Sequence, residues 1–154
     1  MRAVVLFLGI SLGLGSAWGG VREVRQAASL LKRQGPVATE ASLRRLVQTA
    51  PQDALGHQVL ATALLLRGRL DSAQVYYTRA IQLDSTLAEA YNGLGMVYTY
   101  GRQYDRAISV LAQALELDAG QPAFYYNAGV VCERLERLGV FCHPYWFTEH
   151  RYSP

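Results

Sequence analysis

The chain has 154 residues, of which 51% are hydrophobic, and a formal charge of +3. This length suits one compact domain, and the hydrophobic content is too high for a disordered chain. The small positive charge, spread along the sequence, does not indicate a nucleic-acid-binding protein.

Residues 1–19 have the layout of a secretory signal peptide. An apolar run follows Arg2 and ends in small residues. The run is shorter than the roughly 18 to 20 residues of a membrane-spanning helix, which disfavours a permanent anchor. We therefore predict a signal peptide that is cleaved after Ala17 or after Gly19. The mature protein is expected outside the cytoplasm, periplasmic or secreted, without stable membrane insertion.

Residues 20–53 are predicted to form a first, irregular helical hairpin. Apolar residues recur at helical spacing in two segments: Val24, Ala27, Ala28, Leu30 and Leu31, then Leu43, Leu46 and Val47. Gly35 and Pro36 lie between the two segments, and this pair is typical of a turn. Pro51 follows the second segment.

The sequence matches itself when it is shifted by 34 residues. The matched positions are His57 with Tyr91 and Tyr125, Leu60 with Leu94 and Ala128, Ala61 with Gly95 and Gly129, Ala73 with Ala107, and Ala80 with Ala114. Within each copy the apolar residues fall at helical spacing, with breaks around Gly68 and Gly101. We therefore expect a helix-turn-helix hairpin over residues 54–87, another over 88–121, and the first helix of a third over 122–138.

Small residues inside these helices have a steric explanation. Two antiparallel helices approach closely only where the side chains between them are short. Ala61, Gly95 and Gly129 are therefore predicted to lie where the first helix of a hairpin meets the second, with Ala73 and Ala107 opposite. A single hairpin leaves an apolar face exposed to water, so the hairpins are expected to stack.

The second copy resembles a known repeat. Its motif residues are Tyr91, Leu94, Gly95, Tyr98, Tyr104, Ala107, Leu111, Ala114 and Leu117. Their spacing closely resembles the tetratricopeptide repeat (TPR), although Leu111 stands where the family prefers an aromatic residue and Ala119 where it prefers proline. The resemblance covers about residues 21–138. It implies an all-α fold in which helix-turn-helix hairpins stack into a right-handed superhelix, an α-solenoid.

The resemblance also implies a non-catalytic protein-interaction scaffold or adaptor. In TPR arrays the first helix of each hairpin faces a concave groove, in which a peptide or helix of a partner protein binds. The groove residues carried over to this chain are Gln58, Thr62, Leu65, Glu89, Asn92, Met96, Tyr100, Tyr126, Asn127, Val130 and Arg134, with Leu55 and Thr99 as further candidates. Gln58, Asn92 and Asn127 are expected to hydrogen-bond an extended peptide backbone, and Met96 and the tyrosines to supply apolar contact.

A cell-envelope or secretion complex is the expected setting of this adaptor. The alternative is a structural spacer without a groove ligand. Some TPR co-chaperones hold a partner's terminal carboxylate with Lys, Asn and Arg side chains. The corresponding positions here are Gln58, Thr62, Gly93, Ala123 and Asn127, and none of them is cationic. This carboxylate clamp is therefore not expected.

Residues 139–154 depart from the repeat. Pro144, next to Cys142 and His143, would break a helix that runs through it. Three interpretations of this aromatic tail stay open: an irregular cap over the last helix, a partner-binding element, or the end of a truncated array.

No catalytic residue, cofactor or metal site is predicted. No serine has histidine and carboxylate partners at a recognisable spacing, and no glycine-rich phosphate loop is present. Cys132, Cys142, His143 and His150 match no compact metal-binding pattern, so a metal-handling protein is only an alternative function. Cys132 and Cys142 could pair in an oxidising compartment, or Cys132 could be a small apolar core residue.

Overall fold

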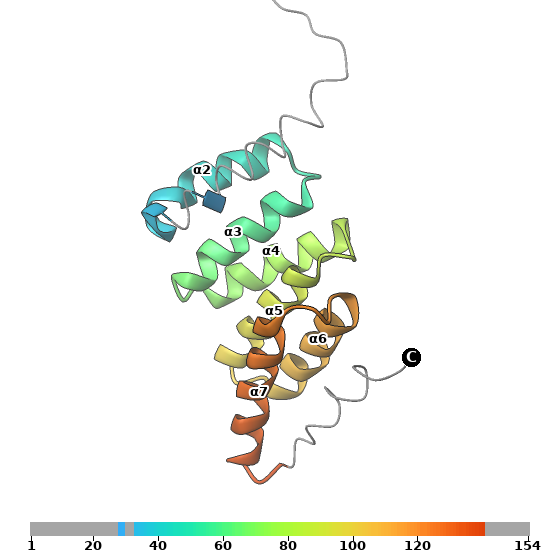
Figure 1. Ribbon diagram of the computed structural model, residues 1–154. Coiled ribbons are helices and arrows are strands. Elements are labelled where there is room, and N and C mark those ends of the chain that lie inside the picture. Colours follow the sequence, from blue (N-terminus) through green and yellow to red (C-terminus); the bar gives the residue numbers. More distant parts are fainter. Residues whose placement is uncertain (1–27, 30–32, 141–154) are drawn as a thin grey trace, which may run out of the picture.

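The computed structural model of the chain describes residues 28–29 and 33–140. This part contains six complete helices and no strand: α2 (Pro36–Thr49), α3 (Ala54–Leu66), α4 (Leu70–Leu83), α5 (Ala88–Tyr100), α6 (Tyr104–Leu117) and α7 (Pro122–Glu136). Figure 1 shows these helices stacked in chain order from α2 to α7. The predicted all-α architecture of stacked hairpins is confirmed. The proposed signal peptide and residues 141–154 lie outside the described residues.

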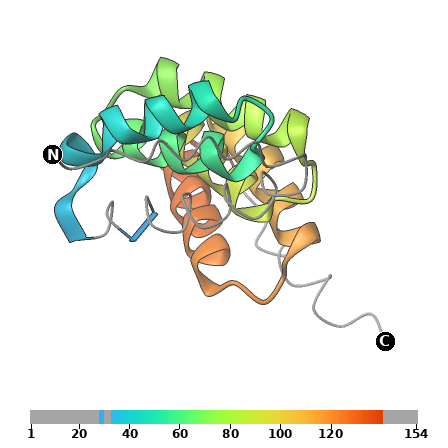
Figure 2. The ribbon, with the colours of Figure 1, turned by 90° about the horizontal axis from the view of Figure 1, so that it is seen from above.

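Successive helices pair into hairpins. α3 packs most extensively against α4, and α5 against α6. The turn inside the first pair contains Gly68 with φ 71°, and the equivalent position of the second turn is Arg102 with φ 58°. α2 and α7 run in different directions in both views, so successive hairpins are rotated along the stack (Figures 1 and 2).

Local signals fix where several helices begin. Asp53 caps α3, since its carboxylate accepts hydrogen bonds from the backbone N–H groups of Leu55 and Gly56 at 3.1 and 3.3 Å. α2 begins at Pro36 and α7 at Pro122. Proline is favoured there because the N–H group it lacks would have no partner within the first helical turn.

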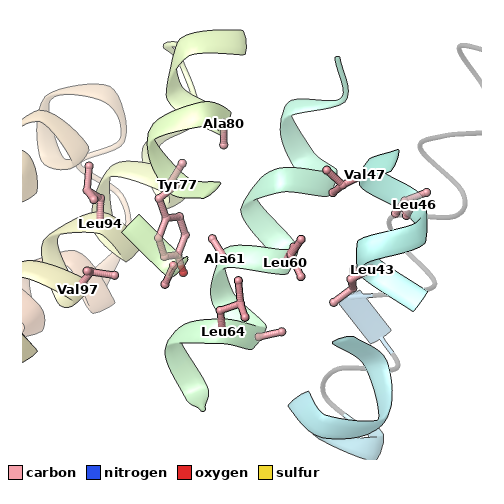
Figure 3. Packing of buried hydrophobic residues seen from close by; sticks show 13 residues of the cluster. Leu43, Leu46, Val47, Leu60, Ala61, Leu64, Tyr77, Ala80, Leu94 and Val97 are labelled. Carbon is pink, nitrogen blue, oxygen red and sulfur yellow. The ribbon is translucent and has the colours of Figure 1, made fainter. Parts of the chain in front are cut away.

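Buried side chains form a core that continues along the stack. A first cluster joins α2, α3, α4 and α5 (Figure 3): Leu43, Leu46, Val47, Leu60, Ala61, Leu64, Tyr77, Ala80, Leu94 and Val97 are labelled there. A second cluster joins α6 and α7. Tyr98 of α5 packs against both clusters. Burial of apolar surface therefore stabilises each hairpin against the next one.

A glycine permits the close approach of α5 and α6. A β-carbon at Gly95 would lie 2.6 Å from Cγ of Leu111, which is fully buried. The side chain nearest to this position is Leu111 and not the predicted Ala107. Gly129 differs, because no described residue lies within 4 Å of its β-carbon position. The contact predicted for Gly129 is thus absent from the described part of the chain, which contains no complete helix after α7.

A buried carboxylate connects α2 to the turn between α3 and α4. Glu40 is 7% exposed and forms ion pairs with Arg44, Arg67 and Arg69. The distance is 2.9 Å to Nε of Arg44 and 3.3 Å to Nη1 of Arg69. The hydrogen bond from Arg44, followed by that from Arg67, lowers the pKa of Glu40 although burial opposes the shift.

We predict opposite effects of alanine at Gly95 and at Gly129. Alanine is more favourable than glycine inside a helix by about 1 kcal/mol. At Gly95 the added methyl group overlaps Leu111, and overpacking costs about 1–3 kcal/mol. G95A should therefore lower the free energy of unfolding, and G129A should raise it by up to about 1 kcal/mol. Urea denaturation followed by circular dichroism measures both, and equal effects would contradict the packing explanation.

Glu40→Gln should remove a part of the stability that depends on pH. Because the pKa of Glu40 is lowered in the folded chain, its contribution is present above the ordinary value of 4.5 and is lost as the pH falls through the folded value. E40Q should lower the free energy of unfolding by about 1 kcal/mol at neutral pH and by much less at about pH 3.

Urea denaturation at these two pH values measures the difference between wild type and E40Q. The matched control is E116Q, because Glu116 is exposed and forms no ion pair within the described residues. A difference between wild type and E40Q that is equal at both pH values would show that the ion pairs do not act as described.

Candidate partner-binding site

The predicted groove residues lie on the first helices of successive hairpins, α3, α5 and α7. These helices contact each other in order, α3 with α5 and α5 with α7. Some of their side chains form hydrogen bonds that connect the helices, and some line a hollow between α5 and α7; Asn127 does both.

Gln58 of α3 connects the first two helices. Its Nε2 donates a hydrogen bond to Oε2 of Glu89 on α5 at 2.8 Å. Gln58 is buried, with 8% of its surface exposed, and its Oε1 has no partner within the described residues. Gln58 therefore links two repeats, whereas the sequence predicts an open contact with a peptide backbone. α3 and α5 contact each other, and this places Glu89 within reach of the Gln58 amide.

Asn92 of α5 and Asn127 of α7 form the equivalent link one repeat later. Nδ2 of Asn127 donates to Oδ1 of Asn92 at 2.8 Å. Both residues are half-buried. The amide nitrogen of Asn92 and the amide oxygen of Asn127 form no hydrogen bond with the described residues. One donor and one acceptor of the pair thus have no partner within the described residues, and the predicted contact with an extended peptide backbone stays a prediction.

Tyr77 of α4 contacts one of the predicted groove residues, Thr62 of α3. It is 2% exposed, and its hydroxyl lies 2.9 Å from Oγ1 of Thr62 on α3. Burial raises the pKa of Tyr77 to about 12. A β-carbon at Gly93 would lie 2.3 Å from Cζ of the tyrosine ring. A side chain at position 93 would therefore collide with Tyr77, which closes one of the positions that a carboxylate clamp uses.

The α3 end of the groove offers little open surface. Thr62 is half-buried and also donates to the backbone oxygen of Gln58 at 3.0 Å. Leu65 is half-buried against the first core cluster. The exposed part of the predicted groove is thus displaced toward α5 and α7.

A hollow of about 630 Å³ lies between α5 and α7. Seven of the predicted groove residues line it: Met96, Thr99, Tyr100, Tyr126, Asn127, Val130 and Arg134. Tyr100 is 62% exposed and Tyr126 73% exposed. Large aromatic side chains that are exposed around one hollow are typical of a protein-interaction surface.

Sequence reasoning missed four further residues that line the hollow: Arg102, Tyr104, Arg137 and Leu138. They lie in the turn after α5, at the start of α6 and beyond the end of α7. The repeat pattern assigns groove residues to first helices only, so it excludes the turns. The one available signal was Arg102, which stands where the preceding repeat has Gly68.

A second hollow, of about 420 Å³, lies beside α4 and includes His57. His57 is buried, its Nε2 lies 3.0 Å from the backbone oxygen of Pro51, and its ring stacks on Tyr76 at 5.9 Å between centroids. His57 thus packs as an aromatic residue of the repeat would. The hydrogen bond identifies Nε2 as the protonated nitrogen and leaves Nδ1 unpartnered within the described residues.

The predicted Cys and His cluster is only partly within the described residues. Cys132 is buried on α7 and is disulfide-bonded. Cys142, His143 and His150 lie outside the described part. Within residues 28–29 and 33–140, no group of three or more His, Cys, Asp and Glu side chains is placed to hold a metal ion. None of the described helices is long and apolar enough to cross a membrane.

Two segments of the chain, residues 56–87 and 88–121, match the model of the tetratricopeptide repeat family. These two segments are similar to tetratricopeptide repeats. The TPR-containing protein trd-1 of Caenorhabditis elegans is 31% identical over 100 residues, which are 64% of this chain and 12% of the relative. This chain thus spans a small part of the length of that relative.

Solved TPR structures share the fold. The second TPR domain of human RPAP3, in complex with the HSP70 peptide SGPTIEEVD, has 19% identity and a TM-score of 0.67 over 76% of this chain and 98% of that domain. The O-GlcNAc transferase of Thermobaculum terrenum has 23% identity and a TM-score of 0.72 over 78% of this chain and 23% of the enzyme. The predicted TPR superhelix is confirmed.

Proposed function

We propose that this chain is a non-catalytic TPR adaptor that binds a peptide or helix of a partner protein between α5 and α7. The observation that carries the proposal is the hollow there, lined by Tyr100 and Tyr126 with more than half of each side chain exposed. A domain of the same fold, the second TPR domain of human RPAP3, is in complex with a peptide. This complex supports a peptide as the kind of ligand.

The alternative functions have less support. A spacer that only sets distances needs the links between α3, α5 and α7 but has no use for exposed aromatic side chains around a hollow. A metal-handling protein would depend on Cys132, Cys142, His143 and His150, whose spacing matches no compact metal-binding pattern. We therefore retain the adaptor as the conclusion.

We further propose that the adaptor acts outside the cytoplasm, in a cell-envelope or secretion complex. The charged start, short apolar run and small residues within residues 1–19 support export. The disulfide bond of Cys132 supports the same setting, because disulfides persist in oxidising compartments and are rare in the cytosol.

Replacing Tyr100 and Tyr126 by alanine together should weaken partner binding at least about tenfold, since each removes a large aromatic contact. Both side chains are mostly exposed, so the thermal midpoint should change little. Capture from the native host with quantitative mass spectrometry identifies the partner, and fluorescence anisotropy with its purified binding segment measures the dissociation constant. The matched control is V37A, because Val37 is 70% exposed on α2, away from the hollow. A partner that binds the double variant and wild type equally would contradict this location of the site.

The exported protein should begin at Trp18 or Gly20, the residues that follow the two predicted cleavage positions. Cell fractionation of the native host and intact-mass measurement of a C-terminally tagged chain check this expectation. Leu8→Arg places a charge in the apolar run and should prevent export. Uncleaved wild-type protein that remains with the cytoplasmic fraction would show that residues 1–19 are not a signal peptide.

A further inference from the structure

We infer that the hollow between α5 and α7 selects an acidic segment of the partner, with the carboxylates held by Arg102, Arg134 and Arg137. This inference rests on the proposed function and specifies the chemistry of the ligand. The three arginines come from the turn after α5, the last turn of α7 and the residue that follows α7. The stacking of hairpins brings them to one hollow.

The charge around the hollow is of one sign. Its lining contains these three arginines and no Asp or Glu. All three side chains are exposed. The ion pairs found among the described residues all involve Glu40 on α2, so none of them neutralises these guanidinium groups. Guanidinium groups bind carboxylates through paired, charge-assisted hydrogen bonds, which makes an acidic segment the complementary ligand.

The backbone of Arg102 adds a second observation. A basic residue near a helix C-terminus is favoured by the helix dipole, so the positions of Arg134 and Arg137 have a structural explanation as well. Arg102 has φ 58°, whereas the equivalent residue of the preceding repeat is Gly68 with φ 71°. A non-glycine residue in this conformation carries an energetic cost, and such costs are retained most often at functional sites. This conformation therefore supports a role of the Arg102 side chain in the hollow.

The ligand must also be partly apolar. Tyr100, Tyr126 and Leu138 line the same hollow and are 62%, 73% and 66% exposed. Of the five clamp positions only Asn127 lines this hollow, and none of the five is cationic. The geometry thus favours acidic side chains beside an apolar one within a segment, and does not require a free chain terminus.

Two occupants from the same chain fit less well. Residues 141–154 contain one acidic side chain, Glu149, together with Arg151 and two histidines. A second copy of the chain brings a formal charge of +3. Neither has the negative charge that would complement three arginines. The arginines therefore favour an acidic segment of another protein as the ligand.

A phage-displayed library of random dodecapeptides, panned against the full chain, tests the inference without a known partner. Enriched peptides should carry an excess of Asp and Glu beside an aromatic or aliphatic residue. Synthetic copies with blocked ends should bind as well as copies with a free carboxyl terminus. Their affinity should fall at least about tenfold between low and high salt, because the contacts are ionic.

Three variants locate the interaction on the arginines. R134Q/R137Q should weaken binding of the enriched peptides about tenfold. R102G should weaken binding several-fold while raising the thermal midpoint, since glycine adopts this backbone conformation without cost; a merely structural arginine would not give this combination. The matched control is R45Q, because Arg45 is exposed on α2 and has no ion pair within the described residues.

The outcomes separate this inference from the proposed function. Peptides that depend on Tyr100 and Tyr126 but show no acidic excess, or that bind R134Q/R137Q normally, would overturn the inference and leave the adaptor function standing. No enrichment at all, as expected if residues 141–154 or a second copy fill the hollow, would overturn the inference. A native partner that also binds Y100A/Y126A as tightly as wild type would remove the proposed function as well.

Discussion

The rest of this structure depends on the close packing of α5 against α4 and α6, the second helices of two successive hairpins. α5 has no β-carbon at positions 93 and 95, and two large side chains occupy the space: the ring of Tyr77 from α4 and the side chain of Leu111 from α6. Both side chains are almost completely buried, so neither can move aside at low cost. α5 is therefore fixed between the hairpin before it and its own partner helix, and the exposed residues near its C-terminal end are fixed with it.

Polar contacts between the first helices then set the shape of the groove. Gln58 is bonded to Glu89 and Asn127 to Asn92, each across a repeat boundary. Gln58 is buried, and a buried polar group that loses its partner costs about 1–3 kcal/mol, so its bond opposes sliding of α3 past α5. The bond between the half-buried Asn92 and Asn127 acts in the same direction between α5 and α7. We expect these contacts to hold the hollow between α5 and α7 in one shape, which would reduce the entropy lost when the proposed partner binds.

The sequence predicts the helices and hairpins of this fold, but it does not predict all residues that line the hollow. A 34-residue period of apolar positions, broken near Gly68 and Gly101, determines helices and hairpins because burial follows that period. The use of Gln58 depends on its distance from Glu89, 31 residues away, and no local pattern encodes that distance. Arg102 lines the hollow because the turn after α5 lies beside α7, and this depends on how the third hairpin position packs on the second. Gly129 repeats the small-residue motif, but in the described residues no second helix packs against it.

Arginines are grouped at both ends of the stack, and the two groups differ in whether a carboxylate lies among them. Around Glu40 three arginines surround a buried carboxylate, so their charges stabilise the contact between α2 and the first TPR hairpin. Around the hollow three exposed arginines form no ion pair within the described residues, so the proposed acidic ligand would supply the opposite charge. Exposed rim charges mainly govern association rate and partner choice, whereas buried aromatic contacts supply most of the binding free energy. In this groove the tyrosines would therefore determine how tightly a segment is held, and the arginines which segment it is.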